Sequence, residues 1–165
     1  MKNNEVKEER LKESKKIALH YMKTLVDVAR EPFLILDADL KVLSANPIFY
    51  QTFEVAPLET EGEFIYKLGN GQWDIPELKK LLEEVLPQKK DVRDYDVTHV
   101  FETIGKKTML LNAGQIDEVQ LIILAIEDIT MTEEFYGKIA EYTKELEAKI
   151  SELQREIADL KKAKK

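Results

Sequence analysis

Apolar and polar residues follow two different periodicities along the middle of the chain, residues 31–130. Two short apolar runs at 33–36 and 42–45 flank a polar turn, which predicts a β-hairpin. From residue 92 onward apolar side chains recur at every second position, and three further strands are predicted there. Strands on both sides of a helical middle predict an α+β fold, in which a five-stranded antiparallel sheet carries helices on one face.

The helical middle has its own start and stop signals. Asn46 and Pro47 suit the N-cap and the first position of one helix. A short helix is expected at 64–68. Asp74 is expected to cap a third helix at 75–86, which should stop before Pro87 because proline donates no backbone hydrogen bond.

The segment before this middle part, residues 6–29, predicts an amphipathic helix. The helix should end before Pro32, because a proline disfavours helical geometry in the residue that precedes it. Its predicted apolar stripe consists of Leu11, Ala18, Met22, Leu25 and Ala29, widened by Ile17, Tyr21 and Val28.

The last segment, residues 131–165, has apolar residues at intervals of three and four that begin at Phe135. From Ile150 on, isoleucine falls at a positions and leucine at d positions, which favours a parallel two-stranded coiled coil. Glu156 and Lys161 fall at g and e positions suited to pairing between chains. We therefore expect a homodimer; the alternative is a lone helix packed on its own domain. The expected dimer interface is Ile139, Tyr142, Leu146, Ile150, Leu153, Ile157 and Leu160.

The heptad pattern is interrupted at Leu146, where two intervals of four follow each other. Such a stutter unwinds a supercoil locally, and we expect two registers of similar energy around it. An element with two states of similar energy is what a signal needs in order to pass along a helix.

Charge and composition support a division into residues 1–30, 31–130 and 131–165. All 5 prolines and 5 of the 6 glycines lie in the middle part, where turns are needed. This part carries 9 basic and 19 acidic residues, which argues against nucleic-acid binding. The chain has no cysteine, which excludes disulfides and cysteine nucleophiles. With no long apolar run and a charged start, we expect neither membrane insertion nor secretion but a cytoplasmic protein.

Candidate chemical groups are few. His99 has the nitrogen that a haem iron or a pH sensor requires, but a packed or surface strand residue is the simpler interpretation. The pairs Asp37/Asp39 and Asp94/Asp96 are better explained as turn and surface residues than as a metal site. No nucleophile is accompanied by a base in a known pattern. We therefore predict no catalytic residues and no metal site, and expect the chain not to be an enzyme.

Four sequence blocks, in order, resemble a PAS domain: VLSANPIFYQTFEV, IYKLGNGQWDIPELKKLLEEVLP, FETIGKKTMLLNA and LAIEDIT. The resemblance covers about residues 30–130 and is strongest to PAS modules of sensor histidine kinases and of multidomain chemotaxis methyltransferase/methylesterase proteins. It implies a sensory or dimerising module, in which the sheet and the middle helices enclose a pocket and the last strand leads into a signalling helix.

The resemblance also implies where the functional residues should lie. A shift of the sheet near the pocket is expected to change the register around Leu146. The coupling residues are expected at the exit of the last strand, where Asp128 and Thr130 suit helix capping. The pocket candidates are Phe49, Phe53, Trp73, His99, Phe101, Leu111 and Ile123, and the coupling candidates are Glu127, Asp128, Ile129, Thr130 and Leu146.

The expected function is a non-catalytic, homodimeric signal relay of two-component or chemotaxis type, whose partner is an output kinase or a chemotaxis signalling protein. The bound group stays open: no ligand, a small molecule, haem, or flavin without a cysteinyl adduct. The alternatives are a ligand-free dimerisation scaffold, which a core filled by aromatic rings would support, and a haem or flavin redox sensor.

Overall fold

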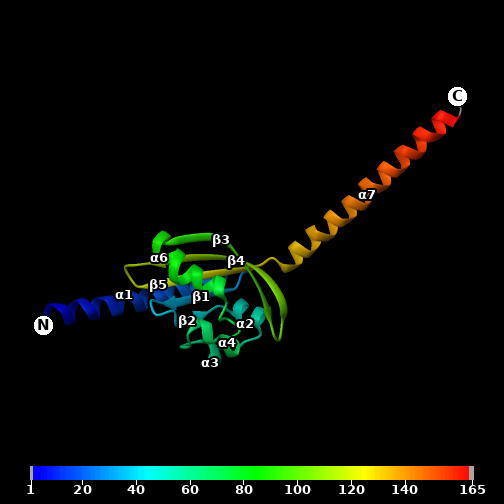
Figure 1. Ribbon diagram of the computed structural model, residues 1–165. Helices are drawn as coiled ribbons and strands as arrows, with labels where there is room; N and C mark the ends of the chain where they lie inside the picture. Colours follow the sequence, from blue (N-terminus) through cyan, green and yellow to red (C-terminus); the bar gives the residue numbers. More distant parts are fainter. Residues whose placement is uncertain (1, 164–165) are drawn as a thin grey trace. The chain divides into compact units, whose positions relative to one another are not determined.

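One antiparallel sheet of five strands, in the order β2-β1-β5-β4-β3, forms the centre of the computed structural model (Figure 1). The structure describes the backbone of residues 2–163 and the side chains from residue 6. The predicted hairpin and the three later strands are present, and the α+β fold is confirmed. The strands are β1 (Phe33–Asp37), β2 (Val42–Ala45), β3 (Asp91–Phe101), β4 (Gly105–Ile116) and β5 (Leu121–Asp128).

Seven short helical segments follow the hairpin, where three helices were predicted, and they cover one face of the sheet as expected (Figure 1). Alternate residues of the strands, such as Leu34 and Leu36 of β1 and Leu124 of β5, point into the core that these segments close. The segments are α2 (Pro47–Phe53), α3 (Pro57–Thr60), the 3₁₀ turn η1 (Ile65–Lys67), α4 (Leu68–Gly71), α5 (Pro76–Lys79), the π-helix η2 (Lys80–Val85) and α6 (Leu86–Lys89).

The last of these helical stretches departs from the prediction at both ends. Its N-cap is Ile75 and not Asp74, whose carboxylate instead forms an ion pair with Lys79. The helix also continues through Pro87 instead of stopping before it. The turns before Pro87 are widened into a π-helix, in which Leu86 donates its N–H to a carbonyl five residues back. π-Helical turns and prolines are both known sites at which a helix departs from regular α-helical hydrogen bonding without ending.

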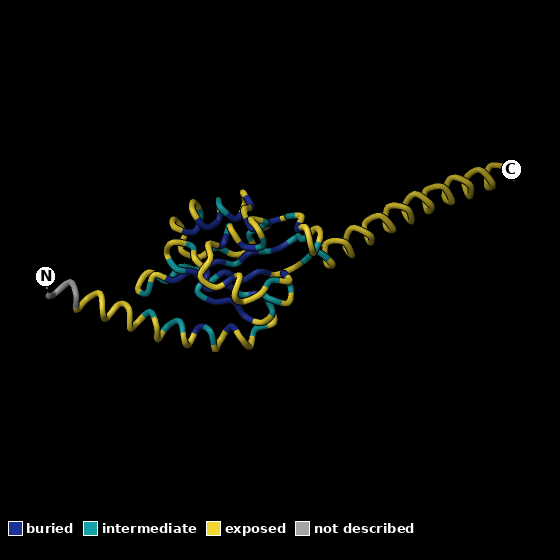
Figure 2. Tube along the Cα trace, turned by 90° about the horizontal axis from the view of Figure 1, so that it is seen from below, coloured by how far each residue is buried: buried dark blue, intermediate teal, exposed yellow. Residues whose placement is uncertain are grey.

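The helix α1 (Lys2–Val26) packs on part of the opposite face of the sheet, over β1 and β5. Met22 and Val26 are buried there with Ile35 of β1 and Leu121 of β5. Figure 2 shows that α1 has both buried and exposed positions. The predicted stripe is partly wrong, because the contact runs through Ala18, Leu19, Met22 and Val26. Four residues of the predicted stripe that lie in α1 are exposed: Leu11, Ile17, Tyr21 and Leu25. Val28, also exposed, lies beyond the end of the helix.

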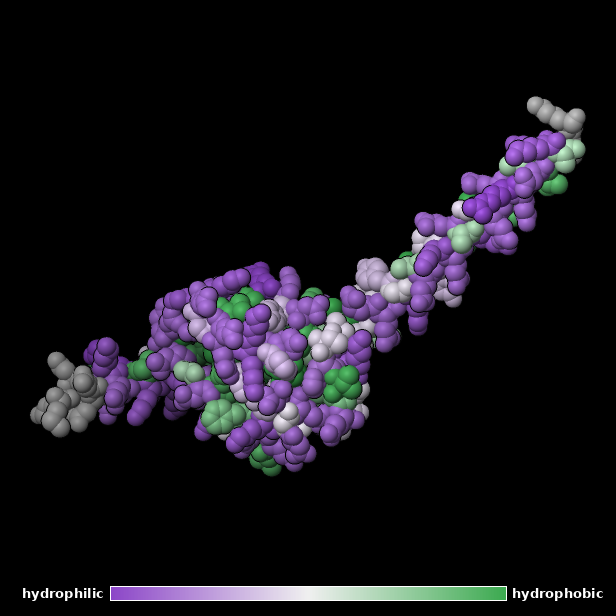
Figure 3. Space-filling model, in the orientation of Figure 1, coloured by the Kyte–Doolittle hydropathy of each residue, from purple (hydrophilic) through white to green (hydrophobic). Residues whose placement is uncertain are grey.

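A single long helix, α7 (Thr130–Ala163), makes up the second unit of the chain, which begins after Asp128. None of its described residues is buried. Its surface in Figure 3 is largely hydrophilic, with hydrophobic side chains spaced along it. No helix within residues 2–163 has both the length and the apolar character needed to cross a membrane.

Candidate sensory core and signalling junction

Four aromatic rings fill the space between the middle helices and the inner face of the sheet. Trp73 lies at the centre, with ring centroids 4.7 Å from Phe53, 5.4 Å from Phe49 and 5.6 Å from Phe101. All four side chains are buried. These separations are those of aromatic rings in direct contact, so the rings themselves occupy the space in which a pocket was expected.

The other three pocket candidates are placed differently. Leu111 is buried in the same core as the rings. His99 is half-buried, and its ring and that of Phe101 meet edge to face, with their centroids 4.9 Å apart. Ile123 lies on the opposite face of the sheet, where it packs against the cluster that contains Met22 and Val26 of α1. Its assignment to the pocket is therefore wrong: β5 is covered on both faces, so its apolar run hides the alternation that would have placed Ile123 outside.

The exit from the sheet is held by contacts at the end of β5. The Lys107 ammonium donates to the Asp128 carboxylate at 2.6 Å, and both side chains are largely shielded. The N–H of Ile126 donates to the carbonyl of Pro32 at 2.9 Å, so the strand that leads to α7 also contacts the segment that leaves α1. The Ile129 carbonyl accepts the first of the helical bonds, from Glu133 at 2.9 Å.

The remaining coupling candidates are spread along the chain. Glu127 is an exposed residue of β5, Thr130 begins α7, and Leu146 is an exposed residue within that helix. Asp37 accepts hydrogen bonds from two backbone N–H groups of its own turn, which confirms its expected turn role. Within the described residues, no three His, Asp or Glu side chains converge as a metal site would require.

No protein-family model and no curated protein matches this chain. Solved structures do match it. The PAS domain of nitrogen regulation protein NR(II) from Vibrio parahaemolyticus matches with a TM-score of 0.51 at 19% identity, over 65% of this chain and 96% of that one. The PAS domain of the fruit-fly ELK potassium channel gives a TM-score of 0.54 at 14% identity, over 68% and 97% of the two chains. The chain has the PAS fold.

A third match is a domain of a sensor histidine kinase. The photoactive yellow protein domain of the sensor histidine kinase Ppr from Rhodospirillum centenum gives a TM-score of 0.53 at 11% identity, over 64% of this chain and 91% of that one. Proteins of such different activity share the fold, so the likeness identifies the architecture, and the function must be argued from the residues.

Asn46 ties the PAS fold to the segment that leaves α1. Its side chain is fully buried, and the Nδ2 group donates to the carbonyls of Val26 (3.0 Å) and Glu31 (2.8 Å). Its Oδ1 accepts from the N–H groups of Phe33 (2.9 Å) and Phe49 (3.0 Å). The bond to Phe49 confirms the predicted N-cap. The other three bonds were missed, because nothing in the sequence shows which carbonyls return to a cap residue.

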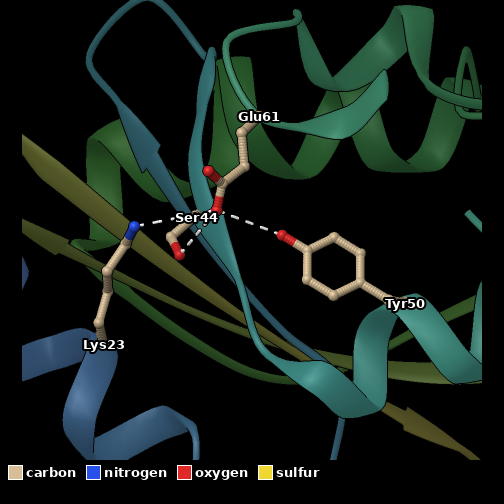
Figure 4. Close-up of polar contacts among 4 residues, drawn as sticks. All are labelled: Lys23, Ser44, Tyr50 and Glu61. Atoms are coloured by element: carbon tan, nitrogen blue, oxygen red, sulfur yellow. Dashed lines mark hydrogen bonds and ion pairs between the residues drawn. The ribbon is translucent and has the colours of Figure 1, made fainter. Parts of the chain in front are cut away.

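A second group of residues that the sequence analysis missed surrounds Glu61 (Figure 4). One carboxylate oxygen of Glu61 accepts hydrogen bonds from Ser44 and Tyr50, each at 3.3 Å, and lies 3.8 Å from the Lys23 ammonium. Burial first, and the Glu61 charge second, raise the pKa of Tyr50 to about 12. The four residues come from α1, β2, α2 and the loop after α3, so Glu61 joins α1 to the edge of the PAS fold.

Proposed function

We propose that this chain is a dimeric relay module without catalytic activity, in which the PAS fold passes a change of state to α7. The observation that carries the proposal is the exposure of the heptad residues of α7, which range from 44% for Ile139 to 67% for Tyr142. A helix with such a row of exposed aliphatic and aromatic residues gains most of its stability by burying them against a partner. The second copy of the same chain is the partner that the heptad pattern favours.

The proposed route of the signal runs through the two segments that meet at β5. Pro32 follows α1 and contacts Ile126 near the end of β5, while Asn46 holds the carbonyls of Val26 and Glu31 in place. A displacement of α1, or of the core around Phe101 and Leu111, would therefore change the direction in which β5 delivers the chain to α7. The stutter at Leu146 supplies two registers between which that change selects.

The proposed output is a histidine kinase or a chemotaxis signalling protein in the cytoplasm. The resemblance of the four sequence blocks supports this class, and so does the PAS-fold neighbour that is part of a sensor histidine kinase. In this account α7 transmits and the partner carries out the reaction.

A second candidate function is a dimerisation scaffold with a permanently filled core. The packing of Phe49, Phe53, Trp73 and Phe101 favours it, because a core filled by its own rings needs no ligand to be stable. The scaffold and the relay predict the same dimer and differ in whether a change in the PAS fold reaches α7.

Native mass spectrometry of the full chain tests the dimer that both functions require. We expect a species at twice the chain mass of 19.1 kDa. Leu153→Glu should shift it to the monomer, whereas Ser151→Glu, two residues away and outside the a and d positions, should leave it dimeric. A monomer in the unmodified chain at micromolar concentration would contradict the proposed function.

A further inference from the structure

A cavity of about 510 Å³ opens in the PAS fold at the end of the sheet where β5 begins. Three parts of the chain form its walls: the turn of the β1–β2 hairpin, the π-helix with the following proline, and the turn between β4 and β5. The lining residues are Ala38, Leu40, Leu82, Glu83, Pro87, Gln115, Asp117, Gln120, Leu121 and Ile122. Its volume lies within the range of small-molecule sites, about 300–1,000 Å³.

The backbone is unusual in each of these three walls. Leu40 and Gln120 have left-handed conformations, with φ of 61° and 53°, which are costly for residues other than glycine. Leu82 and Glu83 belong to the π-helix. Such conformations persist where the surrounding structure holds them, and they concentrate at ligand sites. Here they coincide with a cavity that the sequence analysis did not anticipate.

The lining combines an apolar floor with an acidic rim. Leu82, Leu121 and Ile122 are buried, whereas Glu83 and Asp117 are exposed. No lysine, arginine or histidine is among the lining residues described. An anionic ligand would approach two carboxylates, of which only Asp117 has a cation, Lys90, beside it, and such an approach is unfavourable. The negative charge of residues 31–130 adds to this preference for cations.

The two carboxylates are not equivalent. Asp117 already pairs with Lys90 and accepts a hydrogen bond from Gln115 at 2.8 Å. Glu83 lies near the buried hydroxyl of Tyr66, which has no hydrogen-bond partner among the described residues, and burial with this carboxylate raises the pKa of Tyr66 above its ordinary value. A buried hydroxyl of this kind calls for a partner such as a water or a ligand group. Asp117 has a cation as its partner, whereas no lysine or arginine among the described residues forms an ion pair with Glu83, so Glu83 is the carboxylate that we expect to receive a cation.

We propose that this cavity binds a small molecule with an apolar body and a positively charged amine, with Glu83 as the group that receives the amine. The proposal rests on the relay function above, because the cavity includes Leu121 and Ile122 at the start of the strand that leads to α7. In this proposal the ligand that triggers the relay binds outside the aromatic core, because the rings of that core fill it.

The test is a titration of the ¹⁵N-labelled full chain, followed by amide chemical shifts, with three probes of similar body and different charge. Phenethylamine carries an amine, 2-phenylethanol is neutral and 3-phenylpropionate is an anion. We expect phenethylamine to bind tightest and to shift the amides of Leu82, Gln115, Gln120 and Ile122. Equal affinity for the three probes, binding elsewhere, or no shift at millimolar concentration would overturn the proposal.

Three variants sharpen the titration. Glu83→Gln should weaken phenethylamine binding about tenfold, the value of one charge-assisted hydrogen bond, and should leave 2-phenylethanol unchanged. Glu84→Gln, an exposed neighbour outside the cavity, is the matched control. Ala38→Phe, at an exposed turn position, should block the cavity. An unchanged amine affinity in Glu83→Gln with a folded spectrum would overturn the assignment. The dimer measured by native mass spectrometry is independent of these results, so failure of the ligand proposal and failure of the relay are distinguishable.

Discussion

The two flanking helices, α1 and α7, differ in how much of their apolar surface is buried within the chain. α1 and α7 both carry more apolar residues than a solvated helix needs. α1 buries part of its apolar arc on the sheet, through Met22 and Val26, whereas α7 buries none of its described residues. The difference shows that amphipathic patterning alone does not decide what covers a helix. The outer face of β1 and β5 covers part of α1 within the chain, whereas in the proposed dimer α7 is covered by a second copy of the chain.

The largest effect on the α1 side of this comparison is expected for Asn46→Ala. The substitution removes all four side-chain hydrogen bonds and leaves buried backbone groups unsatisfied, so we expect a loss of about 4 kcal/mol of unfolding free energy. Asn46→Ser keeps an acceptor for the N-cap and should lose less. Chemical denaturation measures both, and equal stability of the alanine variant and the unmodified chain would refute the role of Asn46 as the joint between α1 and the sheet.

The next effect concerns α7 alone. Leu153→Glu places a charge in the proposed interface and should weaken the dimer by about 100-fold or about 3 kcal/mol. Denaturation of the PAS fold should be unaffected by the same change. Sedimentation equilibrium gives the dimer constant, with Ser151→Glu as the exposed control. A dimer that tolerates Leu153→Glu would show that α7 is not the interface.

Met22 and Leu25 provide a matched pair within α1, since one is 9% exposed and the other 69%. Met22→Ala should destabilise the PAS fold by about 2 kcal/mol, because it empties a site against the sheet. Leu25→Ala should change the stability of the fold by less than about 0.5 kcal/mol. Chemical denaturation of the two variants tests this. A larger loss of stability in Leu25→Ala than in Met22→Ala would mean that α1 packs on the sheet through a different face.

The sequence predicts those features of the fold that depend on neighbouring residues, and it fails for those that depend on packing between distant segments. Local signals placed the hairpin, the Asn46 cap and the strand alternation from Tyr95 to Phe101, because each depends on residues close in sequence. The face of α1 and the side of Ile123 depend on which segment packs above β1 and β5. The role of Glu61 could not be predicted, because its three partners are distant along the chain. The π-helix before Pro87 could not be predicted either, because the sequence signal of the proline is for the helix to stop there.

Glu61→Gln is expected to have a small effect on stability. It removes an ion pair between side chains that are both about 40% exposed and keeps an oxygen for Ser44 and Tyr50. Such pairs contribute below about 1 kcal/mol. The change should be visible as a weaker dependence of the unfolding midpoint on salt; an unaltered salt dependence would show that the Lys23 contact adds nothing.

The smallest effect concerns high pH. The folded state holds the Tyr50 proton more tightly than the unfolded chain, because its pKa is raised from 10.0 to about 12. The contribution to stability is therefore complete below pH 10 and is lost as the pH rises toward 12. Tyr50→Phe should reduce the decline in unfolding midpoint over this range, and Tyr21→Phe, at an exposed position of α1, should not. Identical pH profiles for the two variants would contradict the assignment.

The most direct test of the relay reads the register of α7 while α1 is disturbed. Heptads counted forward from Ile139 put Tyr142 in the interface, and heptads counted back from Ile150 put Thr143 there. The chain has no cysteine, so Tyr142→Cys and Thr143→Cys report the two registers by disulfide crosslinking, with Ser151→Cys as the exposed control. We expect Met22→Ala to change the ratio of crosslinking at 142 to crosslinking at 143 in the dimer. An unchanged ratio in a folded, dimeric Met22→Ala chain would contradict the relay and leave the scaffold as the function.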